Sequence, residues 1–174
     1  MLLNIRDFLS SEDSSFDFQG SLYELKSPYE IEDLNLNFPI NYKGKIINLT
    51  NGYELDLDID YSFKCKCSRC LKDIKPRENT SLVAYNYKDK SFYDEDSIDE
   101  YFKIEHESIK LDDLIISTII STKPLKSLCK EDCKGLCPKC GKDLNQGPCD
   151  CDSEKTNRDN IDPRLSKLLD VFKG

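Results

Sequence analysis

The chain has 174 residues, of which 38% are hydrophobic and 33% are charged, a balance typical of a globular protein. This length suits one domain with an appendage and excludes two independent cores. The net charge of −8 argues against a uniformly basic nucleic-acid-binding protein. The most continuous apolar stretch, residues 114–120, is too short to cross a bilayer, and charge begins too early for a secretory signal, so we expect a cytoplasmic protein.

The first elements are weakly indicated, and a clear β pattern begins only near residue 40. Residues 1–39 are polar with scattered aromatics, and we expect a short helix or strand there that docks weakly. The Asn51-Gly52 pair favours a type I′ hairpin turn. After it, apolar and polar residues alternate over residues 53–64, which predicts a long strand with one buried and one solvent-facing side.

The strand before this turn requires a change of phase. Ile40 and Tyr42 follow one phase, whereas Ile47 and Leu49 follow the other. We therefore expect a β-bulge near Gly44.

One more long strand and a helix are expected further along the chain. Residues 81–87 predict a strand, residues 88–100 an acidic loop and residues 101–104 a short edge strand. A helix then begins at Leu111 and ends before Pro124. Its apolar side is expected to cover the sheet and consists of Leu111, Leu114, Ile115 and Ile119.

A short helix is expected near the end of the chain. Asp162-Pro163 fits an N-cap followed by proline at the first helical position. A helix of about 10 residues is marginal alone, so its apolar stripe should dock on the domain or otherwise on a partner. The stripe comprises Leu165, Leu168, Leu169 and Phe172.

Together these elements predict an α+β protein. It contains an antiparallel β-sheet or partly open barrel with a covering helix, a Cys-rich zinc-binding loop and a short C-terminal helix. We expect four segments: the N-terminal residues 1–39, a β-rich core domain with its helix at 40–122, a Cys-rich zinc-binding segment at 123–152, and a linker and C-terminal helix at 153–174.

Six of the nine cysteines lie between residues 129 and 151, and they predict a metal site. Cys137 and Cys140 have the spacing of a metal knuckle, behind which Gly141 lets the backbone turn. In a reducing compartment such clustering favours metal over disulfides, and the alternative is a flexible tail of unliganded thiols. We expect structural zinc, although an iron–sulfur cluster also fits four thiolates. The other candidate ligands are Cys149 and Cys151, which close the loop, then Cys133, which could replace either, and Cys129.

A second group of cysteines allows two interpretations. Cys65 and Cys67 continue the alternation of Phe63 and fit small core-facing residues at a strand end, which is the interpretation we favour. Cys67 and Cys70 also have the knuckle spacing and could share a metal with a surplus cysteine of the tail.

No catalytic arrangement is recognisable in the sequence. The single histidine, His106, lies in an acidic stretch, and there is no serine elbow, phosphate-cradling glycine loop or HExxH motif. An all-cysteine metal site is typical of a structural role. We therefore expect a protein that is not an enzyme and has no small-molecule substrate.

Basic residues gather beside both cysteine groups, since 12 of the 25 lie within residues 64–77 and 123–142. They are either ordinary solvated loops or a face that binds phosphate. In the second case the candidate RNA-binding residues are Lys64, Lys66, Arg69, Lys72, Lys126, Lys130, Lys134 and Lys139. Acidic residues crowd residues 94–113, and the acid-rich face at 54–60 together with the loop at 94–100 would suit an adaptor for basic proteins.

Several motifs also carry a family resemblance. They are Cys67-Ser68-Arg69-Cys70-Leu71, the helix containing Leu111, residues 129–141, Asp143-Leu144-Asn145, Cys149-Asp150-Cys151 and Asp162-Pro163-Arg164-Leu165. Together they resemble the YceD-like large ribosomal RNA subunit (23S rRNA) accumulation protein family of bacteria and plastids. The resemblance runs from about Ile40 to the end, residues 1–39 match only loosely, and Cys65 is additional to the first motif.

The resemblance implies a non-enzymatic ribosome-biogenesis factor. Such a factor would support the accumulation, processing or assembly of large-subunit ribosomal RNA by binding pre-ribosomal RNA, a pre-ribosomal particle or a ribosomal protein. The alternative is an acidic adaptor or chaperone for basic ribosomal proteins that does not itself contact RNA. Neither possibility involves a membrane.

Overall fold

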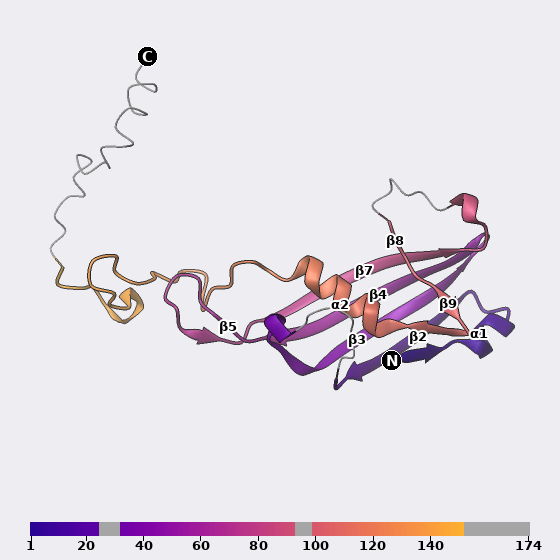
Figure 1. Cartoon of the computed structure of the whole chain (residues 1–174), viewed down its shortest axis with the longest axis horizontal. Helices are drawn as coiled ribbons and strands as arrows, with labels where there is room; N and C mark the ends of the chain where they lie inside the picture. Colours follow the sequence, from indigo (N-terminus) through magenta and orange to yellow (C-terminus); the bar gives the residue numbers. More distant parts are fainter. Residues whose placement is uncertain (25–31, 93–98, 152–174) are drawn as a thin grey trace, which may run out of the picture.

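The computed structural model describes residues 1–24, 32–92 and 99–151. The predicted C-terminal helix and its linker lie outside the described residues, as does the middle of the acidic loop, residues 93–98. The described part is mostly sheet with few helices (Figure 1). None of its helices combines the length and apolar character needed to cross a membrane.

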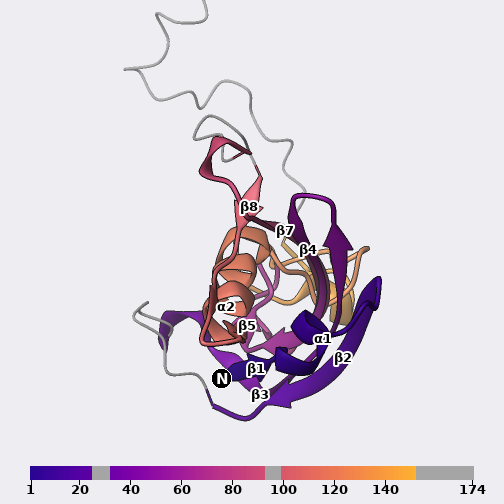
Figure 2. The same ribbon diagram turned by 90° about the vertical axis from the view of Figure 1, so that its right-hand side faces the viewer.

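The main sheet has five strands in the order β2-β3-β4-β7-β8. Neighbouring strands run antiparallel, except that β8 pairs parallel with β7. Because β2 and β8 are the two edges, the sheet is mixed and open rather than a closed barrel, and Figure 2 shows its curvature end-on. The strands are β2 (Ser15–Leu22), β3 (Leu36–Leu49), β4 (Gly52–Phe63), β7 (Arg77–Tyr87) and β8 (Glu100–Tyr101).

Strand β4 confirms the predicted alternation. Its core-facing side chains are all buried, whereas Asp60 on the other side is exposed. The buried residues are Leu55, Leu57, Ile59, Tyr61 and Phe63. Burial of this row on the central strand removes a continuous apolar surface from water.

The β3–β4 hairpin is confirmed, but its turn is not the predicted one. Leu49 pairs with Gly52, so Thr50 and Asn51 form the two-residue loop. A type I′ turn at Asn51-Gly52 would need positive φ at both residues, and neither has it. Glycine is required at position 52 for a different reason: a Cβ there would collide with the carbonyl oxygen of Asn86 on β7.

The predicted bulge near Gly44 is wrong. Gly44 pairs regularly with Leu57, and the register shift lies instead between Asn37 and Asn41, around Pro39, which has no backbone N–H to donate. Ile46 continues the buried phase of the strand, so no change of phase is required.

The N-terminal residues belong to the core, so the prediction of weak docking is wrong. Strand β2 pairs with β3 over its whole length. Ahead of it, β1 (Leu2–Asn4) joins a second sheet of order β1-β10-β9, and α1 (Arg6–Ser10) follows. Ile5 and Phe8 are buried in the main core. These apolar residues are too few and too irregularly spaced to show a period, which is why the pattern gave no signal.

The predicted edge strand at 101–104 is divided in two. Tyr101 ends β8, and Ile104 begins β9 (Ile104–Glu105), which pairs with β10 (Ser108–Lys110). Between them Phe102 is buried in the core, and its backbone N–H donates to the Tyr85 carbonyl at 3.0 Å.

Helix α2 (Leu111–Thr122) packs against the core side of the sheet (Figure 2). Leu111, Ile115 and Ile119 are buried in the same hydrophobic cluster as the β4 side chains, and Leu114 is partly buried against it. The helix ends just before Lys123-Pro124, where proline cannot continue the hydrogen-bond ladder.

Both cysteine segments lie beyond one end of the main sheet (Figure 1). There, β5 (Cys65–Lys66) and β6 (Asp73–Ile74) form a small hairpin that continues from β4. The segment that follows α2 runs alongside this hairpin and contains a short 3₁₀ helix, η3 (Leu144–Gln146). Two further 3₁₀ turns are η1 (Glu32–Leu34) and η2 (Lys90–Phe92).

Candidate metal centres

Eight of the nine cysteines form two groups of four, each of which could hold a metal ion. In each group the four sulfur atoms lie within 4.8 Å of one another. Group A contains Cys67, Cys70, Cys129 and Cys133, and group B contains Cys137, Cys140, Cys149 and Cys151.

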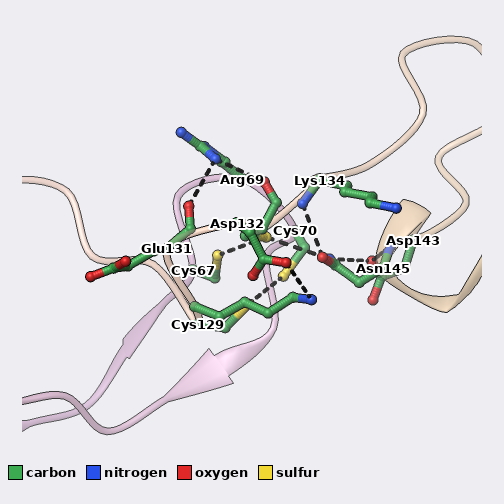
Figure 3. A network of polar contacts seen from close by, with 11 residues as sticks. Cys67, Arg69, Cys70, Cys129, Glu131, Asp132, Lys134, Asp143 and Asn145 are labelled. Carbon is green, nitrogen blue, oxygen red and sulfur yellow. Dashed lines mark hydrogen bonds and ion pairs between the residues drawn. The ribbon is translucent and has the colours of Figure 1, made fainter.

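Group A joins two segments that are far apart in the sequence. Cys67 and Cys70 come from the turn between β5 and β6, whereas Cys129 and Cys133 come from the loop after α2. The Sγ atoms of Cys67 and Cys133 are 3.7 Å apart, and those of Cys70 and Cys129 are 3.6 Å apart (Figure 3). Group A therefore lies where the post-α2 segment meets the hairpin at the end of the sheet.

Group B is local by comparison. All four cysteines lie within residues 137–151, and the Sγ atoms of Cys137 and Cys149 are 3.4 Å apart. Gly147, with φ of 136°, turns the chain back toward the knuckle. The Lys142 ammonium donates to the Pro148 carbonyl at 2.8 Å and fastens the returning arm.

The two groups are built on the same backbone knuckle. The N–H of Cys67 donates to the Lys72 carbonyl and that of Cys137 to the Lys142 carbonyl, each at 2.8 Å. The residue after the second cysteine then donates back to the first cysteine's carbonyl, at 3.0 Å from Leu71 in group A and at 2.9 Å from the glycine in group B. The Cys-x-x-Cys spacing thus specifies one local fold twice in this chain.

The knuckles differ at the residue that turns with positive φ. Group B has Gly141 at 73°, whereas group A has Leu71 at 60° with 57% of its surface exposed. A side chain in this left-handed region costs about 1–2 kcal/mol, and little burial offsets the cost here. We therefore expect Leu71→Gly to raise the free energy of unfolding of the metal-loaded protein by about 1 kcal/mol, measured by urea denaturation.

The reciprocal change should have the opposite sign. Gly141→Ala should destabilise by about 1 kcal/mol, because the added Cβ meets nothing within 4 Å and only the backbone strain remains. A loss of stability in Leu71→Gly would contradict this account and show that the leucine side chain makes contacts that outweigh its strain.

The surroundings of the two groups also differ. Cys67, Cys70 and Cys133 are buried and have their own small hydrophobic cluster, separate from the main core. The partly buried residues packed against it are Ile74, Leu128, Cys129 and Leu136. In group B only Cys137 is buried, and Cys140 is exposed. Group A is therefore the more enclosed site.

Backbone donors prepare the first cysteine of each knuckle for metal. The N–H of Cys70 donates to the Cys67 sulfur and lowers the pKa of that thiol to about 6, although burial acts against it. The N–H of Cys140 lowers the pKa of Cys137 to about 6 in the same way. In contrast, burial raises the pKa of the Cys129 thiol to about 12. A metal ion that binds to group A must therefore displace the proton of the Cys129 thiol.

The structure distributes the six predicted tail cysteines between two groups. Cys137 and Cys140 lie with Cys149 and Cys151, whereas Cys133 and Cys129 lie with the upstream pair Cys67 and Cys70. Cys67 and Cys70 are buried, as core packing requires, but their sulfurs face other sulfurs. Cys65 belongs to neither group.

The eight candidate RNA-binding residues are all exposed and come from the two segments that group A joins. Some of their charge is already engaged: Lys66 pairs with Asp73 at 2.9 Å. The Arg69 guanidinium donates to the Cys133 carbonyl at 2.8 Å, so it also ties the knuckle to the tail (Figure 3). Lys64 and Lys72 lie on or beside the β5–β6 hairpin, and Lys126, Lys130, Lys134 and Lys139 lie on the tail.

Sequence reasoning did not identify Asn145 as a site residue. Its side-chain amide donates to Cys133 Sγ at 3.4 Å, and its carbonyl oxygen accepts from the Lys134 N–H at 2.9 Å (Figure 3). The only sequence signal was its place in the Asp143-Leu144-Asn145 motif, which does not reveal a contact to sulfur.

Comparison with known proteins gives a family and relatives. The sequence model described as "Large ribosomal RNA subunit accumulation protein YceD" matches residues 55–172. Proteins of Mycobacterium bovis and Mycobacterium tuberculosis, each named only as uncharacterized, are 31% identical over 160 residues, covering 83% of this chain and 74% of theirs. No solved structure matches the chain significantly.

Proposed function

The chain belongs to the YceD family of large ribosomal RNA subunit accumulation proteins, and from that premise we propose that it is a non-enzymatic ribosome-biogenesis factor. It binds large-subunit ribosomal RNA or a pre-ribosomal particle through a basic surface that two zinc ions order. The observation that supports this most directly is group A, whose cysteines join the two segments that carry the candidate phosphate-binding residues. We further propose that the protein acts in the cytoplasm.

The arrangement of sulfur favours zinc over an iron–sulfur cluster. Four thiolates at 2.3 Å around a tetrahedral ion are separated by about 3.8 Å. The Sγ–Sγ separations of 3.7 Å (Cys67–Cys133), 3.6 Å (Cys70–Cys129) and 3.4 Å (Cys137–Cys149) are close to that value. In a cluster, iron and sulfide atoms lie between the cysteine sulfurs and spread them apart. Because each group offers four sulfurs and no histidine, no coordination position is left open for catalysis, which suits a structural role.

The basic surface has the chemistry to bind RNA phosphates. Lys64, Lys66, Arg69 and Lys72 approach from the hairpin, and the tail lysines lie beside them only if group A is closed. Lysine and arginine contacts to phosphate release counterions, so such binding weakens steeply with salt. The lysines also offset the charge of about −2 that each four-thiolate zinc centre carries.

The salt dependence of RNA binding tests the proposal. If about five of the eight basic residues contact phosphate, the logarithm of the binding constant should fall with the logarithm of salt concentration at a slope near −4. Fluorescence anisotropy with large-subunit ribosomal RNA fragments measures this slope. A salt-insensitive complex, or none, would reject direct RNA binding.

Charge removal at matched positions locates the surface. Replacing Lys72 and Lys134 with alanine should reduce the steepness of the slope by about 2, because each phosphate contact contributes about 1. The control replaces Lys43 and Lys45, which lie on the exposed side of the sheet beside Asp58 and Asp17. An equal effect of both pairs would show that net charge alone governs binding.

A second candidate function is an acidic adaptor for basic ribosomal proteins. It is favoured by a hollow of about 700 Å³ on the uncovered side of the sheet, lined by Asp17, Asp56 and Asp58 together with Lys43 and Lys45, so that Asp56 is the carboxylate without one of these lysine partners. Crosslinking in cells, followed by sequencing of bound RNA and mass spectrometry of bound protein, distinguishes the two functions. Reversal of charge at Asp56 would abolish capture of protein but spare RNA retention if the adaptor function holds.

A further inference from the structure

Asn145 belongs to the group B loop but contacts a group A sulfur. It lies in η3, between the knuckle of group B and its returning arm. Its Nδ2 atom is 3.4 Å from Cys133 Sγ and 2.7 Å from Asp143 Oδ1. Its Oδ1 atom accepts from the Lys134 N–H, adjacent to that same cysteine, at 2.9 Å. Figure 3 shows the Asn145 side chain beside Lys134 and Asp143.

The group B loop holds this amide in place. Asp143 pairs with Leu136 across an isolated β-bridge, and the Leu144 N–H donates to the Gly135 carbonyl at 2.9 Å. The Asp143 carboxylate also accepts the Asn145 backbone N–H at 2.9 Å. All of these contacts are made by residues 135–145, which lie within the loop from Cys137 to Cys149 or directly before it. A metal in group B would close this same loop and so restrict the orientation of Asn145 further.

A donor to Cys133 bears directly on metal affinity in group A. Hydrogen bonds to a ligand atom orient it and stabilise its charge, and loss of one outer-shell partner typically lowers metal affinity by about 10–100-fold. Within the described residues, Asn145 is the side-chain nitrogen donor to a group A sulfur, and it comes from the other group's loop.

We propose that Asn145 is a positioning residue that couples the two metal groups, so that metal in group B strengthens metal binding in group A. Coupling between equilibrium affinities is reciprocal, so metal in group A strengthens group B by the same factor. This inference rests on the proposal that both groups bind zinc and does not depend on RNA binding.

Cadmium loading of the demetallated full-length protein tests the coupling. ¹¹³Cd NMR resolves two four-thiolate sites as separate resonances, and the double substitution Cys149→Ser and Cys151→Ser leaves the group A resonance for assignment. Asn145→Ala should lower the cadmium affinity of group A by about 10–100-fold and shift its resonance, a change that loss of loop stability alone would not produce. Gln146→Ala, an exposed neighbour in the same 3₁₀ turn, is the matched control.

A double-mutant comparison gives the decisive outcome. In the variant with Cys149→Ser and Cys151→Ser, group A should already bind cadmium weakly. Adding Asn145→Ala to this variant should then lower the cadmium affinity of group A by a smaller factor than it does in the intact chain. Two metal ions per chain with unchanged group A affinity in Asn145→Ala would overturn the coupling alone. Fewer than two ions in the unsubstituted protein would overturn it together with the zinc proposal.

Discussion

Replacing Cys70 with serine should release the post-α2 segment from the end of the sheet. Group A would lose one of its four ligands, and metal content should fall from two ions per chain to one. A structural zinc site supplies on the order of 10 kcal/mol toward ordering its loops. Without the metal, the two segments would be connected by a small cluster of partly buried residues, such as Ile74 and Leu128, and by hydrogen bonds such as that from Arg69 to the Cys133 carbonyl, which together contribute far less. Hydrogen exchange of residues 127–136 should therefore accelerate strongly, while β4 stays protected.

Cys65→Ser is the matched control for this result. Cys65 lies two positions before Cys67 on the same hairpin but belongs to neither group. This variant should keep both metal ions and the exchange pattern of the unsubstituted protein. Equal loss of metal in both variants would place a ligand at residue 65 and contradict the assignment. Slow exchange at residues 127–136 in Cys70→Ser would mean that packing, not metal, holds the tail.

Replacing Ile59 with alanine should cause a large loss of stability of the sheet. Ile59 is fully buried at the centre of β4, between strands β3 and β7. Deleting three methyl or methylene groups from such a site costs about 2–5 kcal/mol, from lost burial and from the cavity that remains. Urea denaturation followed by circular dichroism measures the change.

Val83→Ala serves as its comparison on the neighbouring strand. Val83 lies on β7 with its side chain 46% exposed, on the side of the sheet that α2 does not cover. Its substitution should cost less than about 1 kcal/mol, in line with other exposed sites. Similar losses for the two variants would mean that the uncovered side is buried in solution, for example by a partner.

The sheet was predictable where a period is long enough to be read. β4 alternates over its whole length, and the spacing of Leu111, Ile115 and Ile119 specifies a helical face. Neither the turn at Thr50 nor the register shift near Pro39 was located correctly, because both depend on contacts with neighbouring strands. Strand β1 was missed because its partner β10 lies far away in sequence, and β2 because its apolar residues are too few to show a clear period.

The two cysteine groups could likewise be predicted from the sequence only in part. The Cys-x-x-Cys spacing of Cys137 and Cys140 indicates a knuckle, because that geometry is local. Which cysteines complete each set depends on where β5 and the tail lie in space, and spacing does not encode that. The role of Asn145 could not be predicted from the sequence for the same reason, because its contact with Cys133 forms only once the group B loop has folded back.

The cysteines of group A come from two distant parts of the chain, and this sets an order for folding and for completion of the group. Cys67 and Cys133 are separated by 66 positions, and β7 and α2 lie between them. During translation the first two ligands leave the ribosome well before the last two. The sheet and its helix can therefore assemble before the four cysteines of group A are together and could hold a metal ion. A nascent chain stopped short of residue 129 would expose an open two-thiolate end, and its tail would still be missing.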